Sequence, residues 1–209
     1  MERYEMIVEL CRDLVKPRQV PALEERVRAR VDDRCRLSPL VGFWQTELGT
    51  VDQVVHAWSY RDSGHRDEVR AEAGETPGDA SYLDDLLLSR DTMLIQLASF
   101  SPPLQPGRKG PVYELRIYSY EPGCMSMVTS RWEEKIAQRN KLSPLILCGH
   151  SLTGRLNQWV HIWAYDDLMQ RQEIRSEARR LGVWPPDARA GLITQESSIL
   201  LPLAFSPLS

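Results

Sequence analysis

The chain has 209 residues, of which 42% are hydrophobic and 26% charged, and a formal net charge of −3. These values are typical of a globular protein, and the absence of clustered positive charge argues against a nucleic-acid-binding function. No apolar run approaches the ~20 residues that a membrane-spanning helix requires.

The four cysteines, Cys11, Cys35, Cys124 and Cys148, form no Cys-x-x-Cys pair. A zinc knuckle or dithiol motif is therefore not indicated, and no metal site is predicted. We expect reduced thiols and a cytoplasmic location. Regular structure is expected from Arg3 or Tyr4 onward, which leaves no room for a targeting segment. A mitochondrial location would require that such a segment had been removed. The sequence names no cofactor.

The first half of the chain begins with a predicted strand near Tyr4. Helices follow over about residues 22–34 and 63–73, with a strand over 53–60 between them. Four prolines and two glycines then fill Ser101–Pro111, a composition that can continue neither a helix nor a central strand. The predicted organisation is a first unit over residues 1–101, a linker over 102–111 and a second unit over 112–209.

The second half begins with a strand over residues 113–120, which ends at the turn Glu121-Pro122-Gly123. A helix over about 125–141 is predicted, because apolar residues recur there at four-residue spacing. Strands over about 146–152 and 158–165 follow. A charged helix over about 167–181, capped by Asp166 or Asp167, precedes a last strand over 198–204.

The two halves are related by an internal repeat. Leu37-Ser38-Pro39-Leu40 recurs 105 residues later as Leu142-Ser143-Pro144-Leu145, and the segment Gln53–Tyr60 recurs at the same offset as Gln158–Tyr165. At the front, Tyr4-Glu5 matches Tyr113-Glu114 at an offset of 109. The two offsets together predict a connection four residues longer in the first half, between its first strand and Leu37.

Each half reads strand, helix, strand, strand, helix, strand, which is the order of a ferredoxin-like βαββαβ unit. The predicted fold class is α+β. Such a unit has helices on one face of its sheet and leaves the other face open. Two units in one chain can bury their open faces against each other. The expected result is an intrachain pseudo-dimeric α/β barrel, closed or nearly closed, with its helices outside.

Strand alternation divides the residues between the two faces of each sheet. The odd residues Tyr113, Leu115 and Ile117 are apolar and are assigned to the helix side. The polar and aromatic positions are then predicted to face the barrel interior. They are Glu114, Arg116, Tyr118, Tyr120, His161, Trp163 and Tyr165 in the second half, and Glu5, Glu9, His56, Trp58 and Tyr60 in the first.

These same residues carry a family resemblance. The segment Val112–Tyr118, followed by Glu121-Pro122-Gly123, resembles the opening motif of the NIPSNAP family, and Val160–Asp166 resembles its VHxWxYxD strand. Trp184 and the chain's ending, Leu200–Leu208, are also similar to family features. The resemblance covers all of the second half and, more loosely, the first. In the first half Ile7 is placed where Arg116 stands in the second, and the Pro-Gly turn is absent.

The resemblance implies a dimeric α/β-barrel fold, within a wider superfamily that includes monooxygenases, polyketide cyclases and haem-handling proteins. Animal NIPSNAP proteins are known mostly as mitochondrial and vesicle-associated adaptors. A shared fold does not by itself transfer a reaction.

The candidate catalytic residues are His161 as acid or base, Arg116 as the group that holds an anion or enolate-like oxygen, and Glu114 and Tyr118 beside them. The candidate ligand-binding residues are His56, Trp58, His150, Trp163 and Tyr165. Each has a structural alternative. The histidines could be hydrogen-bonded interior residues, Glu114 and Arg116 an ion pair, and the aromatic residues packed core.

Two hypotheses follow. A protein that binds or transforms a small molecule should enclose a cavity of ~300 Å³ or more at these residues. A non-catalytic adaptor should instead expose an apolar patch outside the barrel, where a protein partner or another copy of the chain would bind. No nucleic-acid partner is expected.

Overall fold

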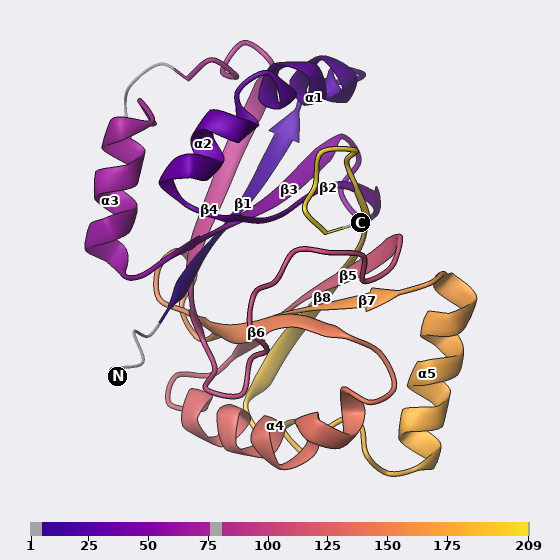
Figure 1. Ribbon diagram of the computed structural model, residues 1–209. Coiled ribbons are helices and arrows are strands. Elements are labelled where there is room, and N and C mark those ends of the chain that lie inside the picture. The colour runs from indigo at the N-terminus through magenta and orange to yellow at the C-terminus, as the bar shows by residue number, and fades with distance from the viewer. Residues whose placement is uncertain (1–5, 76–80, 209) are drawn as a thin grey trace.

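A computed structural model describes residues 6–75 and 81–208 of the chain (Figure 1). In chain order its elements are β1 (Ile7–Val15), α1 (Val20–Arg28), α2 (Val31–Leu37), β2 (Leu40–Leu48), β3 (Gln53–Tyr60), α3 (Ser63–Glu72), β4 (Leu87–Leu97), β5 (Val112–Tyr120), α4 (Met125–Arg139), β6 (Leu145–Ser151), β7 (Gln158–Tyr165), α5 (Leu168–Arg180) and β8 (Leu192–Pro202).

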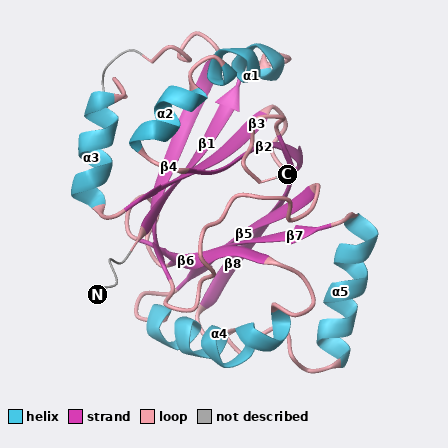
Figure 2. Ribbon diagram, in the orientation of Figure 1, coloured by secondary structure: helices cyan, strands magenta, loops and turns pink. Residues whose placement is uncertain are grey.

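The eight strands form one closed barrel in the order β1-β3-β2-β8-β5-β7-β6-β4. All neighbouring strands are antiparallel. Each half contributes a four-stranded ferredoxin-like sheet, and the halves are joined by the pairs β2–β8 and β4–β6. Figure 2 shows α1, α2 and α3 outside the barrel beside the first sheet, and α4 and α5 outside it beside the second. The predicted fold class and the intrachain pairing are confirmed.

The strand register corrects the predicted alignment of the repeats. Glu9 lies opposite Trp58, as Glu114 lies opposite Trp163. The offset is therefore 105 along the first strands too, and no longer connection exists in the first half. Cys11, and not Ile7, is the counterpart of Arg116, because each lies opposite the third-strand histidine. Tyr4 and Glu5, on which the offset of 109 was based, lie outside the described residues.

The helices follow the predicted positions, with one difference. The predicted helix over residues 22–34 is two helices, α1 and α2, which meet at Ala29 and Arg30. Asp62 and Asp167 cap α3 and α5, each accepting a hydrogen bond from the backbone N–H three residues on. Within the described ranges no helix is long and apolar enough to cross a membrane.

The predicted assignment of faces was wrong. The barrel interior is apolar and is built from both halves. It contains Tyr113, Leu115 and Ile117, which were assigned above to the helix side. Val8, Leu10, Val55, Ala57, Val160, Ile162 and Ala164 belong to the same core. The polar and aromatic set, Glu114, Arg116, Tyr118, His161, Trp163 and Tyr165 with its first-half counterparts, therefore lies on the opposite face of the strands, beneath the helices.

The physical reason lies in barrel geometry. Eight strands enclose a space narrow enough for their own side chains to fill, and here the more aliphatic face turns inward and fills it. Trp44, fully buried, fills part of this space. A Cβ atom on Gly42 would lie 2.1 Å from Cζ2 of Trp44, so that position has room only for glycine. Among the described residues the interior is thus an apolar packed core and not the polar chamber that was predicted.

Replacing Leu115 by alanine should measure what this residue contributes to the packed core. Leu115 is buried in the barrel interior, so Leu115→Ala should lower the free energy of unfolding by about 2–5 kcal/mol. The matched control is Leu88→Ala, because Leu88 is 58% exposed and its truncation should change stability by no more than about 0.5 kcal/mol. Denaturant titration of both variants measures the difference, and equal losses would contradict the packing of Leu115 in the core.

Candidate functional site

The predicted catalytic residues do come together, although not inside the barrel. Glu114, Arg116 and Tyr118 on β5 and His161, Trp163 and Tyr165 on β7 line a cavity of about 180 Å³. Its other walls come from α4, α5, β8 and the loop at Trp184. The six strand residues share one face because alternate residues of a strand point the same way. The cavity is smaller than the ~300 Å³ predicted above for a ligand site. We call it the second-repeat pocket.

Glu114 anchors one end of this pocket. Its Oε1 accepts hydrogen bonds from Arg171, from Arg175 at 3.2 Å and from the Ser197 hydroxyl at 2.8 Å. Its Oε2 accepts from the Tyr165 hydroxyl at 3.4 Å. Burial opposes ionisation of Glu114, but the hydrogen bond from Arg171 and the charge of Arg116 outweigh it and lower the pKa of the carboxyl. Glu114 is therefore an engaged carboxylate.

His161 is held in one tautomer. The indole N–H of Trp163 donates to its Nδ1 at 2.8 Å, so in the neutral ring the proton sits on Nε2. That Nε2 is buried and has no hydrogen-bond partner. Burial, together with the charges of Arg116, Arg139 and Arg175, lowers the pKa of His161 well below its usual value. His161 therefore presents a neutral N–H donor and is not arranged as a base.

An aromatic cluster surrounds this histidine. The Trp132 ring of α4 lies 4.6 Å from the ring of His161 and 4.6 Å from that of Trp184, measured between centroids. Tyr118 meets His161 edge-on at 5.1 Å. These rings keep water from the histidine on its helix side, which strengthens any polar contact that it makes.

Arg139 is a buried cation without a carboxylate partner among the described residues. Only 2% of it is exposed, and it donates to Ser143 and to the Tyr165 hydroxyl. Its guanidinium stacks over Trp163 at 4.1 Å. Burial lowers its pKa. Its first-repeat counterpart, Arg34, instead forms an ion pair with Glu75 at 3.0 Å.

The first repeat contains the same arrangement of side chains, which we call the frame: a buried glutamate held by arginines and a tyrosine, and a histidine held by a tryptophan. Glu9 accepts from Arg66 and Arg70 of α3 and from Tyr60, as Glu114 accepts from Arg171, Arg175 and Tyr165. Trp58 donates to Nδ1 of His56 at 2.9 Å. His56 and Trp58, predicted as ligand-binding residues, line a separate cavity of about 370 Å³, which we call the first-repeat pocket.

The two pockets differ beside the histidine. In the first repeat Nε2 of His56 lies 3.4 Å from Oδ2 of Asp13, and Arg90 holds both oxygens of that carboxylate at 2.7 Å. In the second repeat the register places Tyr118 at the position of Asp13 and Gln195 at that of Arg90. Arg116 replaces Cys11, and its Nε has no hydrogen-bond partner.

The charge balance of the pockets differs accordingly. Four arginines and four carboxylates line the first-repeat pocket among the described residues: Arg30, Arg34, Arg70, Arg90, Glu9, Asp33, Glu72 and Glu75. Four arginines and one carboxylate line the second-repeat pocket: Arg116, Arg139, Arg175, Arg179 and Glu114. Among the described lining residues, arginines outnumber carboxylates four to one in the second-repeat pocket, whereas the two are equal in number in the first.

Several predicted and unpredicted residues remain to be placed. His150 lies on β6, opposite Gln96 and Trp159, and does not line either pocket. The sequence reasoning missed Arg139, Arg175 and Gln195. The repeat itself offered a signal for the first two, since Arg34 and Arg70 recur 105 residues later as Arg139 and Arg175. In the described part of the chain no three His, Cys, Asp or Glu side chains are grouped to hold a metal ion.

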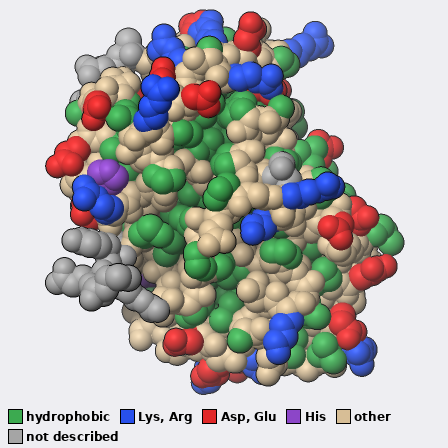
Figure 3. All heavy atoms as spheres, in the orientation of Figure 1, with side chains coloured by type: hydrophobic (Ala, Val, Ile, Leu, Met, Phe, Trp, Pro, Cys, Tyr) green, Lys and Arg blue, Asp and Glu red, His purple; other side chains and the backbone are tan. Residues whose placement is uncertain are grey.

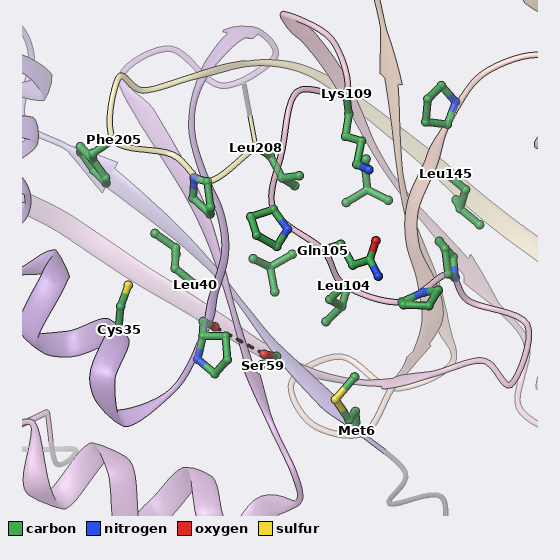
Figure 4. Close-up of a pocket in the computed structure, with 18 of the residues that line it drawn as sticks. Met6, Cys35, Leu40, Ser59, Leu104, Gln105, Lys109, Leu145, Phe205 and Leu208 are labelled. Carbon is green, nitrogen blue, oxygen red and sulfur yellow. Dashed lines mark hydrogen bonds between the residues drawn. The ribbon is translucent and has the colours of Figure 1, made fainter.

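A larger cavity than either pocket lies elsewhere, in a groove of about 760 Å³ between the repeats. Hydrophobic side chains gather over this region in Figure 3. Leu40, Leu104, Leu145, Phe205 and Leu208 converge on it in Figure 4, with linker prolines among them. None of the predicted site residues lines it. None of the described buried polar atoms that lack a partner belongs to it either.

Asp13 should give the protein a defined acid sensitivity. Burial opposes ionisation of its carboxyl, but the hydrogen bonds from Arg90 and His56 outweigh it and lower its pKa in the folded state. The ionised Asp13 carboxylate therefore stabilises the folded protein above about pH 4, which is the pKa of an aspartate in the unfolded chain. This stabilisation is lost as the pH falls below that value.

We expect Asp13→Asn to cost about 3–5 kcal/mol at pH 7, because Arg90 loses its partner, and to flatten the dependence of stability on pH below about pH 4. Chemical denaturation between pH 7 and pH 2 measures both effects. Asp187→Asn is the control, since the side chain of Asp187 is 84% exposed. An unchanged pH dependence in Asp13→Asn would contradict the prediction.

Because Arg139 is buried without a carboxylate partner among the described residues, replacing it should cost less stability than replacing Arg34. Arg34→Met leaves Glu75 without its cation, whereas Arg139→Met leaves no carboxylate unpaired. Because Glu75 is partly exposed, we expect Arg139→Met to cost roughly 1 kcal/mol less than Arg34→Met. Thermal unfolding of the two variants measures the difference, and a greater loss from Arg139→Met would overturn the prediction.

The comparisons with known proteins agree with this architecture. The chain is 34% identical over 179 residues to protein NipSnap homolog 2 of Homo sapiens, and 36% identical over 179 residues to that of Mus musculus. Each match covers 81% of this chain, and the chain spans 62% and 63%, respectively, of those relatives. NipSnap homolog 3B of Homo sapiens is 27% identical over 204 residues, covering 93% of this chain and 82% of that protein.

Solved structures share the fold at low sequence identity. A candidate monooxygenase from Lactobacillus acidophilus matches 94% of this chain and 93% of its own, with a TM-score of 0.70 and 8% identity. An anthrone oxidase-like protein matches 95% of this chain and 92% of its own, with a TM-score of 0.69 and 11% identity. The NIPSNAP family model matches residues 9–102 and again residues 113–207. The chain therefore belongs to the NIPSNAP family and carries two NIPSNAP domains in tandem.

Proposed function

We propose that the protein binds a small anionic organic molecule in the second-repeat pocket. The observation that carries this proposal is the charge of the pocket, where four arginines face a single carboxylate that is already engaged. Arg139 is buried without a carboxylate, and Arg116 and Arg175 share Glu114 with Arg171. Burying positive charge in excess of negative charge is costly, and an anionic ligand would reduce that cost. Equal numbers of arginines and carboxylates line the first-repeat pocket, so an anion would gain no such stabilisation there.

Two unpaired donor groups belong to residues that line the pocket. Nε2 of His161 and Nε of Arg116 are both buried and both lack a hydrogen-bond partner. Each N–H is a donor, and a ligand oxygen that accepted from them would satisfy both. Arg116 keeps the role predicted from the sequence, that of holding an anionic oxygen. For His161 the tautomer favours the role of donor over that of acid or base.

The size of the pocket limits the ligand. At roughly 30 Å³ for each water of the liquid, 180 Å³ holds about six waters, or one single-ring compound. Trp163 and Trp184 supply aromatic walls against which a planar group could stack.

The same donors support chemistry on a suitable substrate. Preorganised N–H groups in a site with little water stabilise negative charge that develops on oxygen, as in an enolate or phenolate. Two structural relatives are named as a candidate monooxygenase and an anthrone oxidase-like protein. Substrates with an ionisable oxygen are consistent with those names. Glu114 is too heavily hydrogen-bonded to serve as the base.

The adaptor hypothesis is the second candidate, and the groove between the repeats is the observation that favours it. The groove has the apolar surface which that hypothesis expects. It contains no buried polar atom that awaits a partner among the described residues. The second-repeat pocket does contain such atoms, and we therefore favour small-molecule binding.

Calorimetric titration with single-ring probes tests the proposal. We expect the anions benzoate and benzenesulfonate to bind and the neutral benzamide not to bind, with affinities that fall as salt is added. Arg175→Gln should weaken binding about tenfold, equivalent to roughly 1.4 kcal/mol. The matched control is Arg180→Gln, which removes a charge from the same helix at a side chain 70% exposed, and it should leave binding unchanged. Equal binding of benzamide, or no binding of either anion, would overturn the proposal.

A further inference from the structure

In the first repeat, the position beside the third-strand histidine is occupied by the carboxylate of Asp13. In the second repeat no carboxylate of the described residues occupies the equivalent position. Asp13 reaches the third-strand histidine from the neighbouring strand β1 and is fully buried. Its carboxylate lies 3.4 Å from Nε2 of His56 and takes two hydrogen bonds from Arg90. In the first repeat, the group that occupies the position beside the histidine is thus a carboxylate that belongs to the chain itself.

The second repeat keeps the donors and lacks the acceptor. Trp163 fixes His161 in the tautomer that Trp58 imposes on His56, so Nε2 carries the proton in both rings. Tyr118 at the position of Asp13 brings no carboxylate, and His161 Nε2 is left without a partner. The histidine is 1% exposed, so bulk water does not satisfy this group.

The position of the positively charged side chain also differs between the two repeats. Arg90 reaches Asp13 from β4, whereas its counterpart, Gln195 on β8, is neutral. The positive charge stands instead at Arg116, on the strand residue directly opposite His161. Its guanidinium lies 5.0 Å over the Tyr118 ring, and its Nε lies 3.8 Å from Glu114, too far for a hydrogen bond.

We propose that the ligand of the second-repeat pocket presents a carboxylate, which accepts from Nε2 of His161 and pairs with Arg116 as Asp13 does with His56 and Arg90 in the first repeat. This inference rests on the anion-binding function proposed above and narrows it to one chemical class. The guanidinium fork matches the two oxygens of a planar carboxylate, and the histidine supplies one further donor. The remainder of the ligand lies toward Trp184 at the pocket wall.

Comparing benzoate with benzenesulfonate separates the two proposals. We expect benzoate to bind about tenfold more tightly, because its planar anion matches the arginine fork. The ¹⁵N and ¹H resonances of His161 Nε2 should shift on adding benzoate, while those of His56 should not. Equal affinities would overturn the carboxylate assignment and leave the anion site standing. No binding of either compound would overturn both proposals.

A grafted carboxylate provides the second test. The double variant Tyr118→Asp, Gln195→Arg copies the first repeat into the second, so it should occupy the donors internally and reduce benzoate affinity about tenfold or more. Arg180→Gln is again the control. Unimpaired benzoate binding by a folded double variant, checked by thermal unfolding, would contradict the proposed position.

Asp13→Ala tests the same preference for a carboxylate in the first repeat and does not depend on the folding of the double variant. Asp13→Ala removes the internal carboxylate of the first repeat and leaves His56 and Arg90 without it. Sodium acetate should then raise the unfolding temperature of Asp13→Ala more than that of the unmodified protein, and sodium chloride at equal ionic strength should not. Equal effects of acetate and chloride would show that the frame does not select a carboxylate.

Discussion

The eight-stranded barrel is filled by its own side chains, and this packing decides where the other parts of the molecule lie. The aliphatic residues of both repeats turn inward and form one continuous core, as Leu10 and Leu115 do. The acidic, basic and aromatic strand residues that line the two pockets are then left on the outer face, beneath the helices. The pockets are a consequence of how the barrel closes, because they occupy the space between a polar sheet face and the helices that cover it.

That space is held by two different kinds of contact. Helices α1 and α4 pack against the sheet through apolar residues such as Leu23 and Trp132. Helices α3 and α5 bury only Val69 and Ala178, and they attach instead through arginines that converge on Glu9 and Glu114. A buried carboxylate on the first strand of each repeat thus fixes the helix that forms one wall of the pocket. Because this contact is ionic and directional, it sets the position of the wall without filling the cavity.

The sequence determined the order of the elements, the tandem repeat and the residues that share a strand face, because these depend on periodicity and local turn chemistry. It did not determine which face turns inward. Both faces of β7 are fully buried, so hydrophobicity alone could not separate Ile162 in the core from Trp163 beneath the helices. The misplaced offset of the first strand had a similar origin, since Tyr4-Glu5 and Val8-Glu9 both resemble Tyr113-Glu114 and only strand pairing distinguishes them. Arg139 could not be recognised as unpaired, because its surroundings come from distant segments.

The covalent link between the repeats has a consequence for how such a protein can change. In a homodimer of identical subunits, every substitution appears twice, so both pockets must keep the same chemistry. Here residues 98–111 join β4 to β5 within one chain, and each position mutates independently of its counterpart. One pocket could acquire Asp13 and Arg90 while the other acquired Tyr118 and Arg116. Fusion thereby allows the two halves of a symmetric scaffold to differ in chemistry, so that a buried carboxylate present in one half need not recur in the other.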